Sequence, residues 1–576
     1  MSDQTKRLLA LLLLIFLSAG IGCSDDDDDD NDVIDDDAID DDDQTPDDDD
    51  DTVDDDTGDD DTVDDDTSDD DTGDDDTGDD DTGDDDTFPD DIIDPPDEMP
   101  FFIERDQIGV APTAQEIAAF TQTMKDFYES SDYFRWAWRM SPGLAEDNEW
   151  DEPGYQIWWT NAYAIKAGDT VTITWHNPPD NTTAKVGRVL PSAIGLYLAT
   201  GDELARDLAL GYIKGLSATY DGMVWGDENP VVDSIMARTV FHRNHTTELD
   251  GGRILAVDYD SVRFEEFARR HDTIHNPENP TWGDIWVRNK RSKDDLPYLY
   301  RNIPLLARLI RATDDDELKQ AAIKLYRQIG AMGRDIVEHG YHIRTKGVDG
   351  EIYIPRLEIG IVDDFASLVN YEIFFPNAEC TAKLNTAYVG YGEALENQCE
   401  HGMSTWYELI ANYGHAWSAN MIWGHHIAAV SLALSYGDYQ AAYPLLVGLG
   451  ERMDKIQASY FRQMYIEWDP EIAQTLVLAA AYGLPLTNKE ARYIIEQFTA
   501  AAEHYGDFAY WDLWDGAIPD GDYEYLPDRY EYDGDAATDA HVRITEIIDL
   551  YEYCYSPLKD AAGAQFIDCD ALLDIQ

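Results

Sequence analysis

The chain has 576 residues and a formal net charge of −81, from 40 basic and 121 acidic side chains. A protein this negative has no electrostatic footprint for a phosphate backbone, which excludes nucleic acid as an expected partner. The same charge disfavours direct adhesion to anionic lipid, so any attachment to a membrane has to come from another source.

Residues 1–22 are predicted to be a leader that a signal peptidase removes. Lys6 and Arg7 make a basic start, residues 8–17 are apolar, and mostly small residues follow. An apolar run of this length is too short to span a bilayer, which takes roughly 20 residues. Together with Cys23, the arrangement resembles a bacterial lipoprotein signal. The resemblance implies lipidation of Cys23 and a lipid-anchored place in the cell envelope, at the outer membrane or cell surface; ordinary secretion with a spare thiol is the alternative.

Residues 23–98 form a strongly acidic segment. Residues 25–98 hold 45 acidic side chains and no Lys or Arg, and residues 52–86 repeat a unit of Thr, one small or apolar residue and three Asp. Such a segment buries too little apolar surface to offset its ordering entropy, and its charges repel one another. We expect a disordered stalk that reaches on the order of 250 Å at full extension. A low-affinity store for calcium is the alternative.

Four further cysteines fall into two local pairs, Cys380 with Cys399 and Cys554 with Cys569. An even number in an exported chain indicates disulfides. Of the three pairings, sequence neighbours are favoured because short loops cost least to close. Four buried free thiols are the alternative.

Residues 99–576 still carry a charge of −37 and show one recurring pattern, which is a helix, a short turn with Gly or Asp, and a second helix. Apolar residues at three- and four-residue spacing from Leu318 to Ile336 place a stripe on one such helix. β-Hairpins are expected at residues 157–175 and 342–354, around Gly-Asp and Asp-Gly turns. The four predicted helical hairpins cover residues 190–216, 296–337, 427–456 and 472–502.

Repeated hairpins with longer inserts resemble an (α/α) toroid, a closed ring of inner and outer helices. We therefore predict a mainly α domain over residues 99–576, with β-hairpin inserts; a multi-domain helical array is the rival. Toroids of this type are common among polysaccharide lyases and glycoside hydrolases, in which the substrate lies across one mouth of the ring. The resemblance implies a glycan partner, although a fold alone does not assign a function.

The first candidate site is Arg291-Ser292-Lys293-Asp294-Asp295 at the head of a predicted helix. Asp294 could act as the acid or base, with Arg291 and Lys293 holding a substrate carboxylate. Ser292 and the two aspartates also suit a helix N-terminus, so simple capping is the alternative.

The second candidate lies in residues 412–417, where Asn412, His415 and Trp417 are loosely similar to the Asn, His and Trp cluster of toroidal alginate-type lyases. The resemblance implies that His415 neutralises the substrate or takes a proton, and that the aromatic ring brackets a sugar. Packing within a helix is the alternative. His415 and His426 would lie about 16 Å apart on a continuous helix, too far to share a metal.

The third candidate is an aromatic and acidic stretch near the C-terminus. Trp511, Asp512 and Trp514 could hold a sugar by stacking and hydrogen bonding, and the acidic residues 520–524 extend the stretch. Calcium is an alternative ligand for these carboxylates, and an aromatic lid is the structural alternative. Four histidines in one insert could form a metal site if a turn joins them, namely His242, His245, His271 and His275.

The sequence contains no serine-hydrolase elbow, phosphate-binding glycine loop, dinucleotide fingerprint or zinc-protease helix motif. The leading hypothesis is therefore a surface lipoprotein that cleaves extracellular polysaccharide by lyase or hydrolase chemistry and requires no cofactor. A lyase needs one group to neutralise the uronate and one to take the C5 proton, whereas a glycosidase needs two carboxylates across the bond. The other hypothesis is a non-catalytic surface protein that binds glycan or a protein partner.

Overall fold

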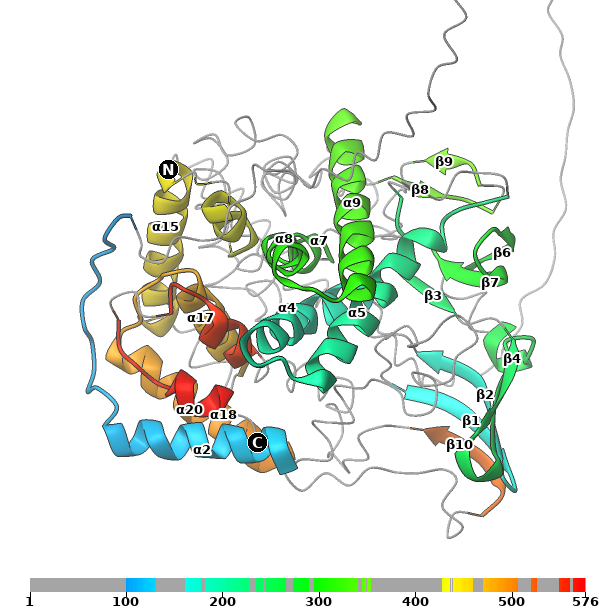
Figure 1. Cartoon of the computed structure of the whole chain (residues 1–576), viewed down its shortest axis with the longest axis horizontal. Helices are drawn as coiled ribbons and strands as arrows, with labels where there is room; N and C mark the ends of the chain where they lie inside the picture. Colours follow the sequence, from blue (N-terminus) through cyan, green and yellow to red (C-terminus); the bar gives the residue numbers. More distant parts are fainter. Residues whose placement is uncertain are drawn as a thin grey trace, which may run out of the picture. The chain divides into compact units, whose positions relative to one another are not determined.

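A computed structural model describes the chain in segments (Figure 1). The chain divides into two compact units, Met1–Phe88 and Pro89–Gln576, and every described residue belongs to the second. This described part is mainly α-helical and carries three small sheets. None of its helices has the length and apolar content needed to cross a membrane. The described residues are 100–130, 161–177, 182–226, 235–241, 244–265, 273–289, 295–339, 344–348, 350–353, 427–435, 437, 439–458, 470–505, 519–525, 549–559 and 563–574.

The first predicted helical hairpin is confirmed as α4 (Thr182–Thr200) and α5 (Glu203–Asp221). Gly201 ends α4 with a φ of 70°, a conformation that glycine adopts without steric cost, and its N–H donates to Tyr197 O at 2.7 Å. The Asp202 side chain then accepts the Ala205 N–H at 2.8 Å and begins α5. The turn signals in the sequence therefore act as expected.

The second hairpin differs from the prediction in its first helix, which is broken into α7 (Asp295–Tyr300) and α8 (Ile303–Ala312). Pro304 lies in the first turn of α8 and cannot donate the backbone hydrogen bond that a continuous helix requires. The Asn302 side chain donates instead to Tyr298 O at 2.6 Å and to Gly187 O of α4 at 3.0 Å. The break therefore ties α7 to α4, and the second helix follows as α9 (Asp316–Glu338).

The third and fourth hairpins lie where the sequence predicts them. A helix over residues 427–435 precedes α15 (Tyr439–Ala458), and α17 (Pro470–Ala481) precedes α18 (Asn488–Tyr505). Residues 427–435 and the described side chains of α17 are buried throughout, whereas α18 alternates buried and partly exposed positions. The first helix of each of these hairpins is thus enclosed, whereas the second is partly exposed.

The C-terminal residues return to the first hairpin. Helical residues 549–555 contact both α4 and α17 through side chains that are described below. The N-terminal α2 (Ala114–Ser130) packs on α18 and on the short C-terminal α20 (Cys569–Leu573), as Figure 1 shows. Tyr128 of α2 also contacts Tyr551, with ring centroids 5.2 Å apart. The two ends of the folded part therefore pack together beside α4 and α17.

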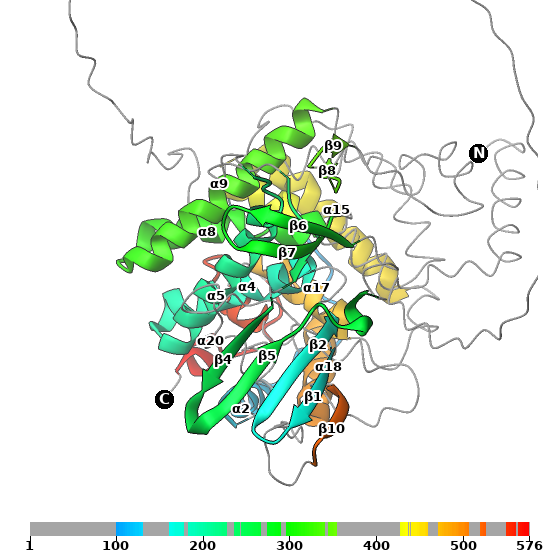
Figure 2. The same cartoon turned by 90° about the vertical axis from the view of Figure 1, so that its right-hand side faces the viewer.

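The predicted β-hairpins are confirmed, and they belong to larger sheets. β1 and β2 join a five-stranded sheet in the order β10-β1-β2-β5-β4, shown in Figure 2, and β8 pairs with β9. A further sheet has the order β3-β7-β6. The strands are β1 (Asn161–Ala167), β2 (Thr170–Asn177), β3 (Thr239–Phe241), β4 (His245–Leu249), β5 (Arg253–Val257), β6 (Thr273–Asn279), β7 (Gly283–Arg288), β8 (Thr345–Lys346), β9 (Ile352–Tyr353) and β10 (Gly521–Tyr525).

One apolar core joins the two larger sheets to the end of α5. Phe241, Tyr259 and Phe264 are buried in it and meet edge to face or tilted, with ring centroids 4.7–5.9 Å apart. Gly222 follows α5 directly, and a Cβ added there would lie 2.7 Å from a methyl carbon of Val240. The sheets are therefore packed closely against the helical hairpins.

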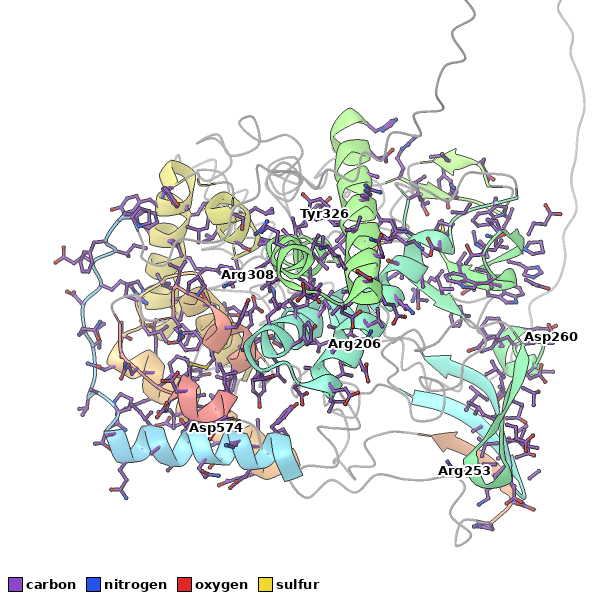
Figure 3. The ribbon with its side chains drawn as sticks, viewed as in Figure 1. Arg206, Arg253, Asp260, Arg308, Tyr326 and Asp574 are labelled. Carbon is purple, nitrogen blue, oxygen red and sulfur yellow. A yellow bond between two sulfur atoms is a disulfide. The ribbon has the colours of Figure 1, made fainter. Side chains whose placement is uncertain are left out.

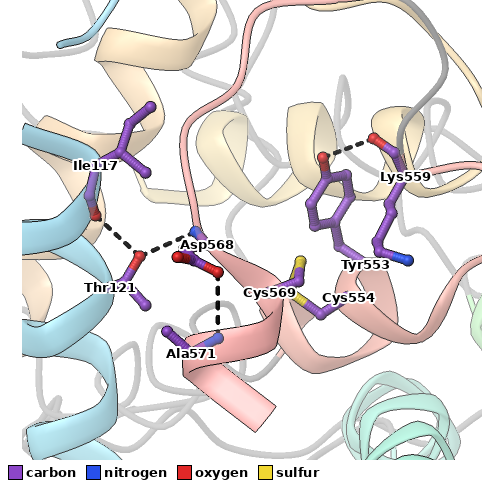
Figure 4. Close-up of a disulfide and its surroundings, with 8 residues drawn as sticks. All are labelled: Ile117, Thr121, Tyr553, Cys554, Lys559, Asp568, Cys569 and Ala571. Carbon is purple, nitrogen blue, oxygen red and sulfur yellow. Dashed lines mark hydrogen bonds between the residues drawn. A yellow bond between two sulfur atoms is a disulfide. The ribbon is translucent and has the colours of Figure 1, made fainter. Parts of the chain in front are cut away.

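The predicted disulfide between Cys554 and Cys569 is confirmed and is drawn in Figure 4. It joins the helical residues 549–555 to α20, whose preceding residue Asp568 donates its N–H to Thr121 of α2 at 3.0 Å. The other predicted pair, Cys380 with Cys399, lies outside the described residues.

We expect the double variant Cys554→Ser/Cys569→Ser to lose stability, because the bridge closes a loop across 15 residues of sequence. A loop of that size corresponds to roughly 3 kcal/mol in the chain-entropy account. Urea unfolding of both proteins without reductant measures the loss. A loss below about 1 kcal/mol would show that α20 is held by packing alone.

Candidate functional site

Most candidate residues from the sequence lie outside the described part of the chain. This applies to Cys23, to Arg291, Lys293 and Asp294, to Asn412, His415 and Trp417, and to Trp511, Asp512 and Trp514. The description resumes at Asp295, the first residue of α7, immediately after the first candidate. The structure therefore shows the helix that follows the first candidate directly in the sequence.

The histidine cluster is described at two of its four positions. His275 in β6 hydrogen-bonds Asp284 and stacks on Trp286, with ring centroids 4.6 Å apart. His245 lies in β4, in the other large sheet, while His242 and His271 lie outside the described residues. Among the described residues there is no group of three or more His, Cys, Asp or Glu that could hold a metal.

The acidic residues 520–524 do not form a loop but lead into and form the edge strand β10. Asp520 Oδ1 accepts the Gly168 N–H at 2.7 Å and so caps the β1–β2 turn. The two carboxylate oxygens of Asp522 accept hydrogen bonds from Nη1 and Nη2 of Arg263. These two carboxylates already have protein partners, which is a structural role for residues that the sequence presented as sugar or calcium ligands.

The most unusual chemistry of the described part is a buried group of charges, here called the Arg301 cluster and defined as Arg301, Asp549 and Glu552. Arg301 lies at the break between α7 and α8, and its Nη2 is 3.3 Å from Glu552 Oε2 and 3.7 Å from Asp549 Oδ1. The same nitrogen donates to Arg188 O of α4 at 3.1 Å. The side chains of Arg301, Asp549 and Glu552 are 3%, 0% and 4% exposed, so water is almost completely excluded from them.

Hydrogen bonds connect the Arg301 cluster to α4, to α17 and to the turn that follows α17. Asp549 accepts from Ser192 of α4 at 3.2 Å and from Gln474 of α17 at 2.6 Å. Glu552 Oε1 accepts from the hydroxyl of Tyr482 at 2.8 Å. Removal of α4 or α17 would leave the buried Asp549 without one of its hydrogen bonds, and an unsatisfied buried polar group is costly.

The protonation of this group is set by burial. Loss of water raises the pKa of Asp549 to about 7; the positive charge of Arg301 opposes the rise and the negative charge of Glu552 adds to it. Burial also raises the pKa of Tyr482 well above its usual value, so that this hydroxyl stays neutral and donates. Two carboxylates share one guanidinium, so the second negative charge favours the protonated form of Asp549.

A carboxyl that titrates near neutral pH beside a second carboxylate has the chemistry of a general acid and base pair. Here each side chain is less than 5% exposed. A polymeric substrate cannot reach atoms so deeply enclosed. In this conformation the Arg301 cluster therefore fixes the positions of α4, α7, α17 and residues 549–555 relative to one another.

The sequence analysis missed this cluster. Asp549 and Glu552 stand three residues apart in an otherwise apolar helix, so their spacing predicts that they share a face. Arg301 was placed inside one predicted helix. A charged pair on an apolar helix face was the available signal, but the distant Arg301 could not be identified from it.

A second buried acid joins two further helices. Asp221, the last residue of α5, accepts from Lys324 Nζ at 2.5 Å and from Gln328 Nε2 at 2.9 Å, both on α9. Burial raises the pKa of Asp221, and Lys324 opposes that rise. These contacts hold α5 beside α9, so the first two hairpins are joined through their second helices as well.

No protein-family model matches the chain, and neither a curated protein nor a solved structure matches it. The function of the chain therefore has to be inferred from its own residues.

Replacing Arg301 by Met should lower the free energy of unfolding by about 3–5 kcal/mol, because two buried carboxylates lose their cation. Arg206→Met is the matched control: Arg206 pairs with acids at the surface (Figure 3) and should lose less than about 1 kcal/mol. Urea unfolding at pH 7 compares the two. Equal losses would contradict the assignment.

Asp549→Asn should change how stability depends on pH. The pKa of Asp549 is about 7 in the folded protein against an ordinary 3.8, so the folded state holds a proton that the unfolded chain releases. Its stabilising effect is therefore fully present below about pH 4 and is lost as the pH rises through about 7. The unfolding free energy of wild type minus variant, measured from pH 4 to 8, should fall across that range.

Asp315→Asn is the control with the opposite sign. Hydrogen bonding from Arg206 lowers the pKa of Asp315, so its stabilising effect is present above the ordinary value of 3.8 and is lost as the pH falls.

A wild-type minus Asp549→Asn difference that stays constant, or that rises with pH, would show that Asp549 is ionised in the folded protein throughout.

Proposed function

We propose that this protein is a lipid-anchored bacterial surface protein whose helical domain binds and cleaves extracellular polysaccharide. The leader with Cys23 supports the anchor, and the acidic residues 25–98 support a spacer between lipid and domain. With a charge of −37 on residues 99–576, the domain itself has no affinity for an anionic membrane.

The observation that carries the proposal is the place of residues 549–555 between the first and fourth hairpins. They contact α4 through Ser192 and α17 through Gln474, while α2 covers them from outside through Tyr128. In the third and fourth hairpins the first helix is enclosed and the second is partly exposed. This pattern, with the C-terminal residues returning to the first hairpin, is what a closed (α/α) toroid requires. The proposed ring would present the ends of its inner helices at a mouth wide enough for a chain of sugars.

The proposed site lies at the start of α7. This helix packs on α4 and has only six residues, which is about 9 Å of length. Arg301 at its far end is locked in the buried cluster, so the segment immediately before Asp295 is attached to a rigid support. Within that segment we assign Asp294 as the acid or base and Arg291 with Lys293 as the substrate clamp.

The remaining candidate residues have proposed roles as sugar contacts. His415 would transfer or neutralise a proton, with Asn412 and Trp417 near it, and the aromatic stretch around Trp511 would stack on sugar rings. No cofactor is needed for either a lyase or a hydrolase of this design. Calcium is a second proposed ligand, held by the carboxylates of the stalk.

The test is to incubate the complete mature chain with a panel of acidic and neutral polysaccharides, and to record new reducing ends and unsaturated products together. We expect cleavage, and we expect Asp294→Asn and His415→Ala to reduce the rate at least 100-fold. Asp316→Asn at the exposed start of the outer helix α9 makes the same chemical change away from the proposed site and should leave the rate unchanged.

The products decide the chemistry. Reducing ends with unsaturation identify a lyase, and reducing ends alone identify a hydrolase. Full activity of either variant removes that residue from the site. Binding of one glycan without cleavage across a broad panel would support the non-catalytic surface protein, for which the enclosed carboxylates of the Arg301 cluster are the favouring observation.

A further inference from the structure

Residues 100–113, here called the entry segment, connect the acidic stalk to α2. They are extended, and they lie against α15 and the start of α18. Phe101 makes an edge contact with Tyr443 of α15, with ring centroids 5.1 Å apart. Farther along, the Lys489 N–H donates to Ile108 O at 2.8 Å. The chain is thus attached to the helical hairpins before its first helix begins.

The strongest contact of the entry segment is a buried ion pair. Arg105 donates from Nη1 to Glu490 Oε2 at 2.9 Å and from Nη2 to Oε1 at 2.8 Å. Nη1 also donates to Pro485 O at 2.8 Å. The side chains of Arg105 and Glu490 are 4% and 0% exposed, so water does not compete for this two-point contact.

A second arginine makes the corresponding contact in the opposite direction. Glu490 and Glu116 both complete a capping box, because they accept the N–H of Thr487 and Thr113 at 2.8 and 2.7 Å. Arg105 from the entry segment binds the glutamate of α18, and Arg492 of α18 binds the glutamate of α2. Hydrogen bonding from Arg492, aided by Thr113, lowers the pKa of Glu116 to about 2, so this pair stays charged.

The two pairs differ in burial and in order along the chain. Arg492 and Glu116 are 31% and 43% exposed, and water and salt weaken such a pair. Arg105 is buried and comes first when the chain is followed from the stalk. A pull that enters through the stalk therefore meets the strong contact before it reaches the weak one and α2.

We propose that the entry segment is the mechanical anchor of the tether, and that Arg105 with Glu490 is the contact at which a pull on the stalk is stopped. The inference rests on the proposed tether. Loss of α2 would uncover Tyr551, which lies in the same helix as Asp549 and Glu552, and α20, which is joined to that helix by the disulfide. The anchor thereby prevents a pull on the stalk from reaching the contacts that α2 makes with Tyr551 and α20.

The test stretches the complete mature chain between handles at its two ends in a single-molecule force instrument. In wild type, the only lengthening before the first unfolding event should be that of the stalk. In Arg105→Ala, release of residues 100–113 should occur at lower force. It should add the difference between the contour length of the segment, about 50 Å at roughly 3.3–3.6 Å per residue, and the distance that the segment already spans in the fold. Arg105→Lys keeps the charge without the two-point geometry and should fall between them.

Arg492→Ala is the matched control, since it removes the exposed pair with Glu116 and the hydrogen bonds to Val110 O and Ala111 O, all of which lie downstream of Arg105. It should leave the first release at the wild-type force. The proposal would be overturned if the wild-type chain released the segment at as low a force as Arg105→Ala does. It would also be overturned if Arg492→Ala lowered the force of the first release. If Arg105→Ala does not fold, release of the segment at low force in the wild-type chain would still overturn the proposal. The handles replace the membrane, so failure here is distinct from failure of the lipid anchor or of polysaccharide cleavage.

Discussion

The burial of one guanidinium between two carboxylates is the constraint on which the helical domain depends. Arg301 comes from the α7–α8 break, whereas Asp549 and Glu552 come from the far end of the chain, and all three are almost completely excluded from water. Charges in such a place have to be paired and hydrogen-bonded, so α4 and α17 each contribute a polar side chain. The interaction therefore specifies which helices lie together, beyond what apolar packing selects.

The constraint also links the core to the proposed chemistry. α7 is short, its C-terminal end is bound to α4 through Asn302, and its first residue follows the Arg291–Asp294 segment. A reactive group needs a rigid support to hold it within a fraction of an ångström. The helix α2 adds a second support from outside, because it packs on α18 and on the C-terminal α20.

The sequence predicted the four helical hairpins, two β-hairpins and one disulfide, since each depends on local turn signals, periodicity or short loops. Three features required contacts that are distant in sequence. Pro304 was a local signal for the helix break, but the partner of Asn302 lies on α4. β10 pairs with β1 across more than 350 residues, and the acids of the Arg301 cluster lie about 250 residues from their arginine. Single-sequence patterns carry no information about such pairings, and most of the candidate residues from the sequence lie outside the described part of the chain.

The most direct test of the central claim is native-state hydrogen exchange of the backbone amides in residues 549–555, compared with those of α4 and α17. If the buried charges lock these helices into one unit, the three segments should exchange only through a common opening, with the free energy of global unfolding. Exchange of residues 549–555 through an opening several kcal/mol cheaper than that of α4 would show that the C-terminal helix is only loosely attached, and would contradict the account.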